Sequence, residues 1–409
     1  MKTFSLFILY SITIFMEKYF YFLIPISFDR STSDLKKSRK KIINNVREKL
    51  SIREVDSAVV YSVVGNETGK DQYVTGLELS YRDQENQPHK RNLAVKYLSS
   101  RNEPLYLSSL KSAVLRGLNQ EVTFYNELSG RIPFVTPECI FADSIPLLYR
   151  GIIIMEKLNP DFTVDDYLGC LPDQSMTVIK NISLMHAKFW NRILSDPSLN
   201  WLPGRQNPLD LFWFLNYITK KEKACVILWE ALYKHFARHP ITVAHGDCRP
   251  GNIMWFDNGS IAMLDWQFAH AGIGTWDATY YIVMAHDIKV RKENEFSLIA
   301  QYYSDLSVSY KKFHSEELPY SEKQCMEDHQ ILKLLLGLYG WAALVSHMFD
   351  KYGNDPRDVR SWADRITSAI NDLDSDFISG KIKIPARVID DFKTIMDNAG
   401  RETKERFIE

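Results

Sequence analysis

Residues 244–267 read AHGDCRPGNIMWFDNGSIAMLDWQ, and this stretch decides the fold. His245, Asp247 and Asn252 stand in the pattern H-x-D-x-x-x-x-N. A short apolar run follows them, then the strong hairpin turn signal D-N-G, and then a second apolar run that ends at Asp265. We therefore expect Asp247, Asn252 and Asp265 to lie at the same end of one small hairpin.

Asp and Asn are common turn residues, so Asp247 or Asn252 alone would indicate a turn and nothing more. Turn chemistry does not explain a further carboxylate, Asp265, placed directly after a strand. In kinase catalytic loops one Asp accepts the proton of the substrate hydroxyl, while an Asn and a second Asp hold Mg²⁺ at the nucleotide phosphates. The ordered set therefore favours phosphoryl transfer. The candidates are Asp247 and His245 for catalysis, and Asn252 and Asp265 for the metal.

The segment HGDCRPGNIMW…AMLDWQFAHAGIGTWDATYYI, residues 245–282, resembles the catalytic segment of the aminoglycoside phosphotransferase and choline kinase-like superfamily. The triplet DWQ and the run Gly272–Asp277 resemble most closely its ecdysteroid-kinase-like (CHK kinase-like) branch. The resemblance implies an α+β, bilobal protein-kinase-like fold with a small β-rich N-lobe and a larger, mainly helical C-lobe. It also implies ATP and Mg²⁺ as cofactors, and a small molecule with a hydroxyl group as acceptor.

The same resemblance gives individual residues a role. It implies that Asp247 is the catalytic base, that Asn252 is a metal ligand and that Asp265 is the principal metal ligand. Asp277 matches a family Asp that braces the catalytic loop. Protein kinases carry H-R-D, D-F-G and a later A-P-E, whereas this chain has HGD and DWQ and no A-P-E follows. This favours a small-molecule acceptor over a protein; a non-enzymatic nucleotide-binding protein on the same fold is the second alternative.

Upstream, residues 92–98 read NLAVKYL, an apolar strand with one lysine, Lys96. A lone lysine in a strand is also typical of an edge residue with its head in water. A helix is expected over Leu118–Leu128, and its spacing lets Glu121 share the face turned toward the sheet. A strand lysine paired with a glutamate of the next helix is the kinase arrangement at the α- and β-phosphates. We therefore predict that Lys96 and Glu121 form an ion pair at the nucleotide.

The run GNETG, residues 65–69, follows a probable strand and is a candidate for covering the phosphates. Small residues let backbone N–H groups approach a phosphate closely. Gly65, Thr68 and Gly69 are therefore nucleotide-binding candidates. A plain hairpin turn is the alternative interpretation of this run.

Residues 151–158, GIIIMEKL, form an apolar strand that becomes polar at its end. The resemblance places the hinge between the lobes there. It implies that Met155 precedes the hinge and that the main chain at Glu156 and Lys157 reads the adenine edge. An ordinary core strand is the alternative interpretation.

The composition is that of an ordinary globular protein, with 45% hydrophobic and 25% charged residues. A chain of 409 residues is long enough for two lobes, and its net charge of −1 gives no electrostatic case for nucleic acid. The five cysteines are scattered, odd in number and without a C-x-x-C pair. This pattern indicates neither a zinc site nor a disulfide framework, and it favours a reducing, cytoplasmic location.

Three regions are expected along the chain: an apolar extension over residues 1–34, the N-lobe over 35–158 and the C-lobe over 159–409. The extension holds two apolar runs separated by Glu17 and Lys18. A membrane-associated segment, a non-functional extension and a cleaved signal are the alternatives for it. The first of these would give weak membrane association through the N-terminus.

The C-lobe is expected to be helical after its catalytic segment. The apolar run 330–348 contains Gly337 and Gly340, which favour close helix packing over a membrane span. The charged segment 382–409 is expected to be peripheral, and His186 is expected to be a core or boundary histidine. The expected helices are 295–310, 325–349 and 359–373.

Overall fold

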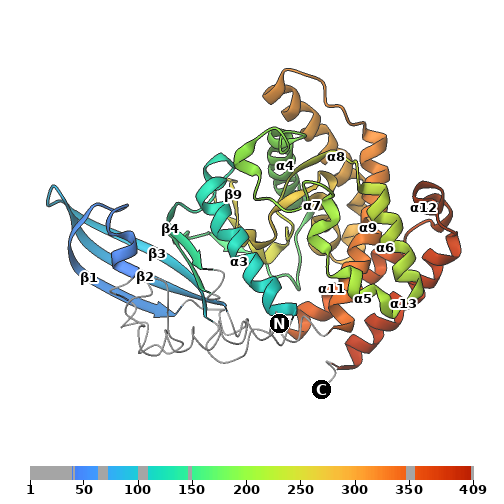
Figure 1. Cartoon of the computed structure of the whole chain (residues 1–409), viewed down its shortest axis with the longest axis horizontal. Coiled ribbons are helices and arrows are strands. Elements are labelled where there is room, and N and C mark those ends of the chain that lie inside the picture. The colour runs from blue at the N-terminus through green and yellow to red at the C-terminus, as the bar shows by residue number, and fades with distance from the viewer. Residues whose placement is uncertain are drawn as a thin grey trace, which may run out of the picture. The chain divides into compact units, whose positions relative to one another are not determined.

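The structure is a computed structural model that describes residues 39, 42–62, 72–99, 109–145, 150–346 and 355–406. These residues divide into two compact units. The N-terminal unit covers the described residues up to Gly130 together with Thr136–Asn159, and the C-terminal unit covers Arg131–Val135 and those from Pro160 onward. The first unit is built on a β-sheet and the second is mainly helical, so the fold is α+β, as predicted (Figure 1).

A five-stranded antiparallel sheet forms the N-terminal unit. Alternate residues of its middle strands are buried, among them Leu77, Leu79, Leu93 and Val95, because successive strand residues point to opposite faces. This face packs against the helical residues 42–47. The strands, in sheet order, are β1 (Ile52–Ser62), β2 (Gln72–Asp83), β3 (Pro88–Ser99), β5 (Arg150–Glu156) and β4 (Cys139–Ile145).

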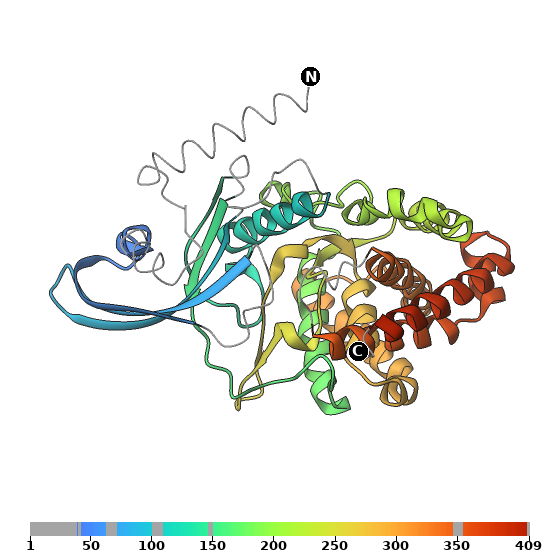
Figure 2. The same cartoon turned by 90° about the horizontal axis from the view of Figure 1, so that it is seen from below.

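The opposite face of this sheet carries Lys96, which pairs in register with Ile153 of β5. Helix α3 (Ser109–Glu127) packs on this part of the sheet, against β4 and β5 (Figure 2). A Cβ atom added at Gly151 would lie 2.2 Å from Leu118 Cδ2. Glycine is therefore needed there for the helix and the strand to approach each other so closely.

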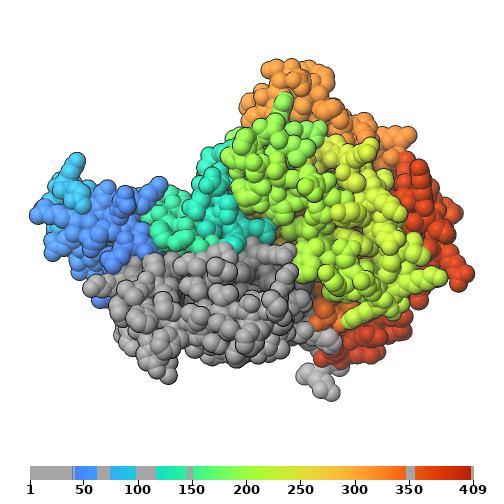
Figure 3. All heavy atoms as spheres, in the orientation of Figure 1, coloured from blue at the N-terminus to red at the C-terminus, as the bar shows by residue number. Residues whose placement is uncertain are grey.

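The C-terminal unit combines helices with two small antiparallel sheets. One sheet pairs β10 (His270–Ile273) with β7 (Ile241–Ala244), and the other orders β6 (Phe162–Thr163), β8 (Ile253–Trp255) and β9 (Ile261–Met263). The segment of α5 and α6 forms part of the face seen in Figure 3. The helices are α4 (Pro172–Phe189), α5 (Leu215–Ile218), α6 (Lys223–Phe236), α7 (Thr275–Met284), α8 (Ile288–His314), α9 (Glu322–Val345), α11 (Pro356–Asn371), α12 (Ser375–Ile382) and α13 (Ala386–Arg406).

Two helices organise the core of the C-terminal unit. Every residue of α7 is buried. Helix α9 packs closely on α11, because Cβ atoms at Gly337 and Gly340 would lie 2.6 Å from Ile370 Cδ1 and 2.7 Å from Ile366 Cδ1. The prediction that these glycines serve close helix packing is confirmed.

Two expectations need correction. Within the described part of the chain, no helix has both the length and the apolar character needed to cross a membrane; residues 1–34 lie outside that part. The predicted location, with its membrane-associated segment, is therefore not upheld. The charged segment 382–409 is not peripheral either: α13 places Val388, Ile389, Phe392 and Met396 in the core. Their spacing makes one apolar stripe on an otherwise charged helix.

Candidate active site

The loop that begins at His245 leaves the fully buried strand β7. At Gly246, the next residue, the backbone has a φ of 85°. A Cβ atom at this position would lie 2.4 Å from the carbonyl oxygen of Phe268. Only glycine accommodates both the positive φ and this close approach. The glycine of the HGD triplet is thus required by the turn itself.

Asp247 and Asn252 are joined within this loop. Asn252 Nδ2 donates to Asp247 Oδ2 and to the Asp247 carbonyl oxygen, both at 2.9 Å. The hydroxyl of Tyr280, from α7, donates to Asp247 Oδ1 at 2.8 Å. Burial and then the charge of Asp247 raise the pKa of Tyr280 well above its ordinary value, so this hydroxyl stays a donor. The Asp247 carboxylate is therefore held in one orientation by donors to both oxygens.

The hairpin β8–β9 ends against the same loop. Leu264 N–H donates to the Asn252 carbonyl oxygen at 2.9 Å, directly after β9. Asp265 follows with φ 63° and ψ 63°, in the left-handed region, which Asp and Asn tolerate better than other non-glycine residues. Gln267 Nε2 donates to Asp265 Oδ2 at 3.1 Å. The strand end that carries Asp265 is thus bonded to the loop that carries Asp247 and Asn252.

His245 connects the start of the loop to the end of the hairpin. Its Nδ1 accepts from the Asp247 N–H at 3.2 Å, and its Nε2 lies 2.9 Å from the Leu264 carbonyl oxygen. A carbonyl only accepts, so Nε2 carries the proton and donates it. The ring also lies against Trp266, with centroids 4.5 Å apart. Both ring nitrogens are engaged by the main chain.

Asp277 braces the loop, in the manner that the resemblance implies. Its carboxylate accepts from the N–H groups of His245 at 2.7 Å and Gly246 at 2.9 Å. His186 Nε2 lies 3.1 Å from the same carboxylate. Burial would raise the pKa of Asp277, but the hydrogen bond from His186 and the surrounding donors lower it to about 2. The buried carboxylate is therefore charged.

His186 is a buried, hydrogen-bonded core histidine, as expected. Its Nδ1 lies 2.8 Å from the hydroxyl of Tyr302, which itself donates to the Gly274 carbonyl oxygen at 2.7 Å. Since that hydroxyl has one hydrogen, Nδ1 must donate to it. Nε2 faces the carboxylate of Asp277, so the ring links this carboxylate to Tyr302.

A second brace was not foreseen from the sequence. Asp166, in the segment before α4, accepts from the Gly251 N–H at 2.8 Å and from Arg249 Nη1. Arg249 Nε also donates to Asp247 Oδ2 at 3.3 Å. Burial would lower the pKa of Arg249, but the carboxylates of Asp247 and Asp166 raise it above its ordinary value. Asp166 precedes Gly251 by 85 residues, and no pattern in the sequence connects the two.

In the N-terminal unit, the expected ion pair is present. Lys96 Nζ lies 2.6 Å from Glu121 Oε2, and the two side chains are 11% and 1% exposed. Lys96 belongs to β3 and Glu121 to α3. The alternative, an edge lysine with its head in water, does not fit this burial.

The structure gives a different result for the other candidate nucleotide-binding residues. Gly65, Thr68 and Gly69 lie outside the described residues. Met155 pairs with Ala94 on the face that carries Lys96. The N–H groups of Glu156 and Lys157 donate to the carbonyl oxygens of Glu138 and Asn92, at 2.8 and 2.9 Å. Both main-chain donors are therefore used within the sheet, and neither is free for an adenine edge in this conformation.

Comparison with known proteins finds a family model that matches part of the chain, and solved structures with a similar fold. A family model described as the phosphotransferase enzyme family matches residues 198–302, which include the loop, the hairpin and Asp277. No curated protein matches the sequence. The ethanolamine kinase of Plasmodium vivax is similar in structure, with a TM-score of 0.53 and 13% identity over 83% of this chain and 89% of that chain. A candidate aminoglycoside phosphotransferase from Ralstonia eutropha gives a TM-score of 0.50 and 11% identity over 84% and 98%.

At these identities the solved structures show a shared fold. The family match covers the segment in which the superfamily resemblance was found. Together they support the aminoglycoside phosphotransferase and choline kinase-like superfamily. They do not distinguish its ecdysteroid-kinase-like branch.

Proposed function

We propose that the protein is a kinase that transfers the γ-phosphoryl group of ATP to a hydroxyl group of a small molecule. The observation that carries this proposal is the joined loop and hairpin, which brings together Asp247, Asn252 and the strand end before Asp265. Most of the machinery of phosphoryl transfer is positioning and electrostatics, and such a site needs rigid polar groups. The family match over the same residues supports it.

In this proposal, Asp247 is the catalytic base. The donors Tyr280 and Asn252 keep its carboxylate oriented. It accepts the proton of the acceptor hydroxyl while that oxygen forms a bond to the γ-phosphorus. The bond from the γ-phosphorus to the bridging oxygen breaks, and ADP leaves with the electron pair. His245 acts as a positioning residue, because both of its nitrogens hold the main chain.

Asn252 and Asp265 fit a magnesium site by the chemistry of their atoms. The amide nitrogen of Asn252 is used on Asp247, which leaves the oxygen, the atom that a hard cation prefers. Asp265 adds a carboxylate in a fixed backbone conformation. Magnesium bound there would neutralise charge on the phosphate oxygens. Lys96, held by Glu121, is proposed to pair with the α- and β-phosphates.

The chemical class of the acceptor is proposed as well. The DWQ triplet leads us to place the chain nearest the ecdysteroid-kinase-like branch, so sterols join choline, ethanolamine, aminoglycosides and simple alcohols as acceptors to be tested. The purified full chain, with ATP and Mg²⁺, should form ADP faster in the presence of at least one of them. Asp257→Asn, an exposed residue of the hairpin turn, is the control that should behave as wild type.

Two outcomes would count against the proposal. Nucleotide binding without transfer to any acceptor would favour the non-enzymatic alternative. Transfer to a peptide hydroxyl in preference to every small molecule would favour a protein kinase.

A further inference from the structure

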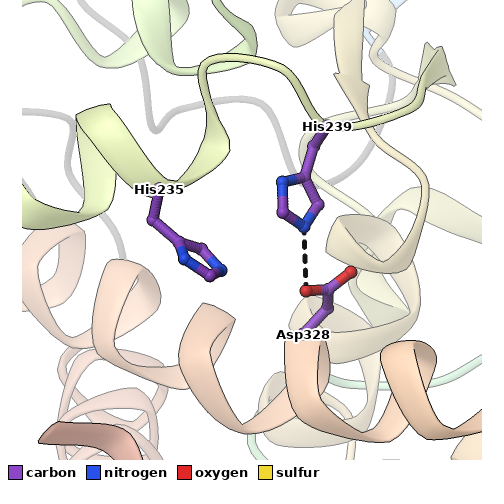
Figure 4. A group of neighbouring side chains, drawn as sticks. All are labelled: His235, His239 and Asp328. Atoms are coloured by element: carbon purple, nitrogen blue, oxygen red, sulfur yellow. Dashed lines mark hydrogen bonds and ion pairs between the residues drawn. The ribbon is translucent and has the colours of Figure 1, made fainter. Parts of the chain in front are cut away.

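Three potential metal ligands meet away from the catalytic loop, between α6 and α9 in the C-terminal unit. His235 lies near the end of α6, and His239 lies in the turn that leads to β7. Asp328 belongs to α9. Their ligand atoms all lie within 4.8 Å of one another. Figure 4 shows the three side chains directed into the same space.

The carboxylate of this group is held in place by an outer partner. Asp328 Oδ1 lies 3.0 Å from His239 Nε2, and Asp328 Oδ2 accepts from the Tyr320 hydroxyl at 2.6 Å. Tyr320 is also hydrogen-bonded to Thr275 Oγ1, at 2.8 Å. Metal-binding carboxylates are commonly oriented by such outer hydrogen bonds.

His235 is the member of the group whose environment needs an explanation. Its Nε2 is buried and has no hydrogen-bond partner among the described residues. A buried polar atom of this kind costs free energy unless something else satisfies it.

We propose that His235, His239 and Asp328 bind one divalent transition-metal ion, with Zn²⁺ as the best fit. Two imidazoles and one carboxylate are typical zinc ligands. Mg²⁺ and Ca²⁺ prefer oxygen ligands, so these side chains fit them poorly. Ligands about 2.1 Å from zinc in a tetrahedron lie about 3.4 Å apart. The His239–Asp328 pair, at 3.0 Å, is close to this spacing, and a small separation of the pair with a rotation of the His235 ring would complete the site. Water would take the fourth position.

The place of this site indicates what it does. His239 lies two residues before β7, and β7 ends one residue before His245. An ion held there would fasten the α6–β7 turn to α9, behind the strand that carries the catalytic loop. It is a stabilising site and takes no part in phosphoryl transfer. The proposal does not depend on the proposed function, since Asn252 and Asp265 are separate residues with oxygen ligands.

The test uses the purified full chain, freed of metal with a chelator and then titrated with ZnCl₂ in excess Mg²⁺. We expect one zinc per chain by elemental analysis, and a melting temperature that rises with zinc concentration. Co²⁺ in place of Zn²⁺ should give the visible absorption of a four-coordinate site. His235→Ala and His239→Ala should abolish these effects, and Tyr320→Phe should weaken binding about tenfold.

His89→Ala is the matched control, because His89 pairs with Asp83 at 2.8 Å but belongs to no three-ligand group of the described residues. It should bind zinc as wild type does. In chelator, wild type and His235→Ala should melt at the same temperature, which separates metal loss from misfolding. Absence of zinc binding by wild type would overturn the proposal and leave a histidine–aspartate hydrogen bond only. Binding that His235→Ala leaves unchanged would overturn it too, by placing the ion elsewhere.

Discussion

The catalytic loop and the Lys96–Glu121 pair are held in place by different means. The loop forms hydrogen bonds with the segment before α4, with the end of the β8–β9 hairpin and with α7. Asp277 alone accepts from two of its N–H groups. In the N-terminal unit, an ion pair between β3 and α3 holds Lys96.

This difference separates two ways of holding functional side chains, one within each unit. The loop is preorganised by many mutually supporting bonds, so a change in its braces should alter stability and activity together. The lysine needs only to be held at the right place, so its loss should alter activity more than folding. The predictions below test this contrast, beginning with the largest expected effect.

Asp265→Asn should lose nearly all phosphoryl transfer, about 10³-fold or more, because the metal loses its carboxylate. Asn is the substitution of choice, because it also tolerates the left-handed backbone found there. The fold should therefore survive, as a thermal melt would show. Mg²⁺-dependent nucleotide binding should fall as well, whereas Asp257→Asn should retain it. Unchanged Mg²⁺-dependent affinity in a folded Asp265→Asn would remove this residue from the metal site.

Asp277→Asn should lower the free energy of unfolding by about 3 kcal/mol, because the substitution removes a buried charge and breaks hydrogen bonds to it. An amide has one acceptor oxygen, and its NH₂ would face a donor from His245, Gly246 or His186. Activity should fall in the same variant, since the loop loses its support. Urea unfolding measures the first effect and ADP formation the second. A fully stable variant would show that the loop is not braced here.

The stability of the protein should also depend on pH through Asp277. Its pKa is lowered from the ordinary 3.8 to about 2 in the folded state. The resulting stabilisation, about 2 kcal/mol, is present above about pH 4 and is lost as the pH falls toward 2. Urea unfolding of wild type and of Asp277→Asn between pH 5 and 2 measures the contribution of Asp277 to the pH dependence of stability. Parallel curves for the two proteins would contradict the assignment.

Lys96→Ala and Glu121→Ala should each reduce kcat/KM by about tenfold or more, and the double variant should lose less than the product of the two. Either change disables the same pair. The exposed pair Lys90–Glu78, at 2.9 Å on neighbouring strands, is the matched control and should leave turnover unchanged. Fully additive losses would mean that the ion pair has no shared role in catalysis.

Much of the site was predictable because its parts are close together in the sequence. The loop, the D-N-G turn and Asp265 lie within twenty-four residues, and the strand lysine precedes a helix of regular period. Asp166 was missed because it reaches the loop only through the tertiary fold.

Two helices show why the rest was harder to predict. Tyr280 was missed because α7 is buried on all sides, so that helix has no amphipathic period to reveal it. The apolar stripe of α13 was missed for the opposite reason, since its charged composition conceals five buried apolar residues.

The most direct test of the proposed function follows the phosphoryl group itself. The full chain is incubated with Mg²⁺, γ-labelled ATP and each acceptor, and label in the acceptor is measured beside the affinity for ATP. With wild type, we expect label on the hydroxyl of a small molecule. With Asp247→Asn, we expect the rate of labelling to fall by about 10²-fold or more, because an amide cannot take the proton. The affinity for ATP should remain nearly unchanged. Near-normal transfer by Asp247→Asn, or a loss of ATP binding equal to the loss of transfer, would contradict the role of Asp247 as the base.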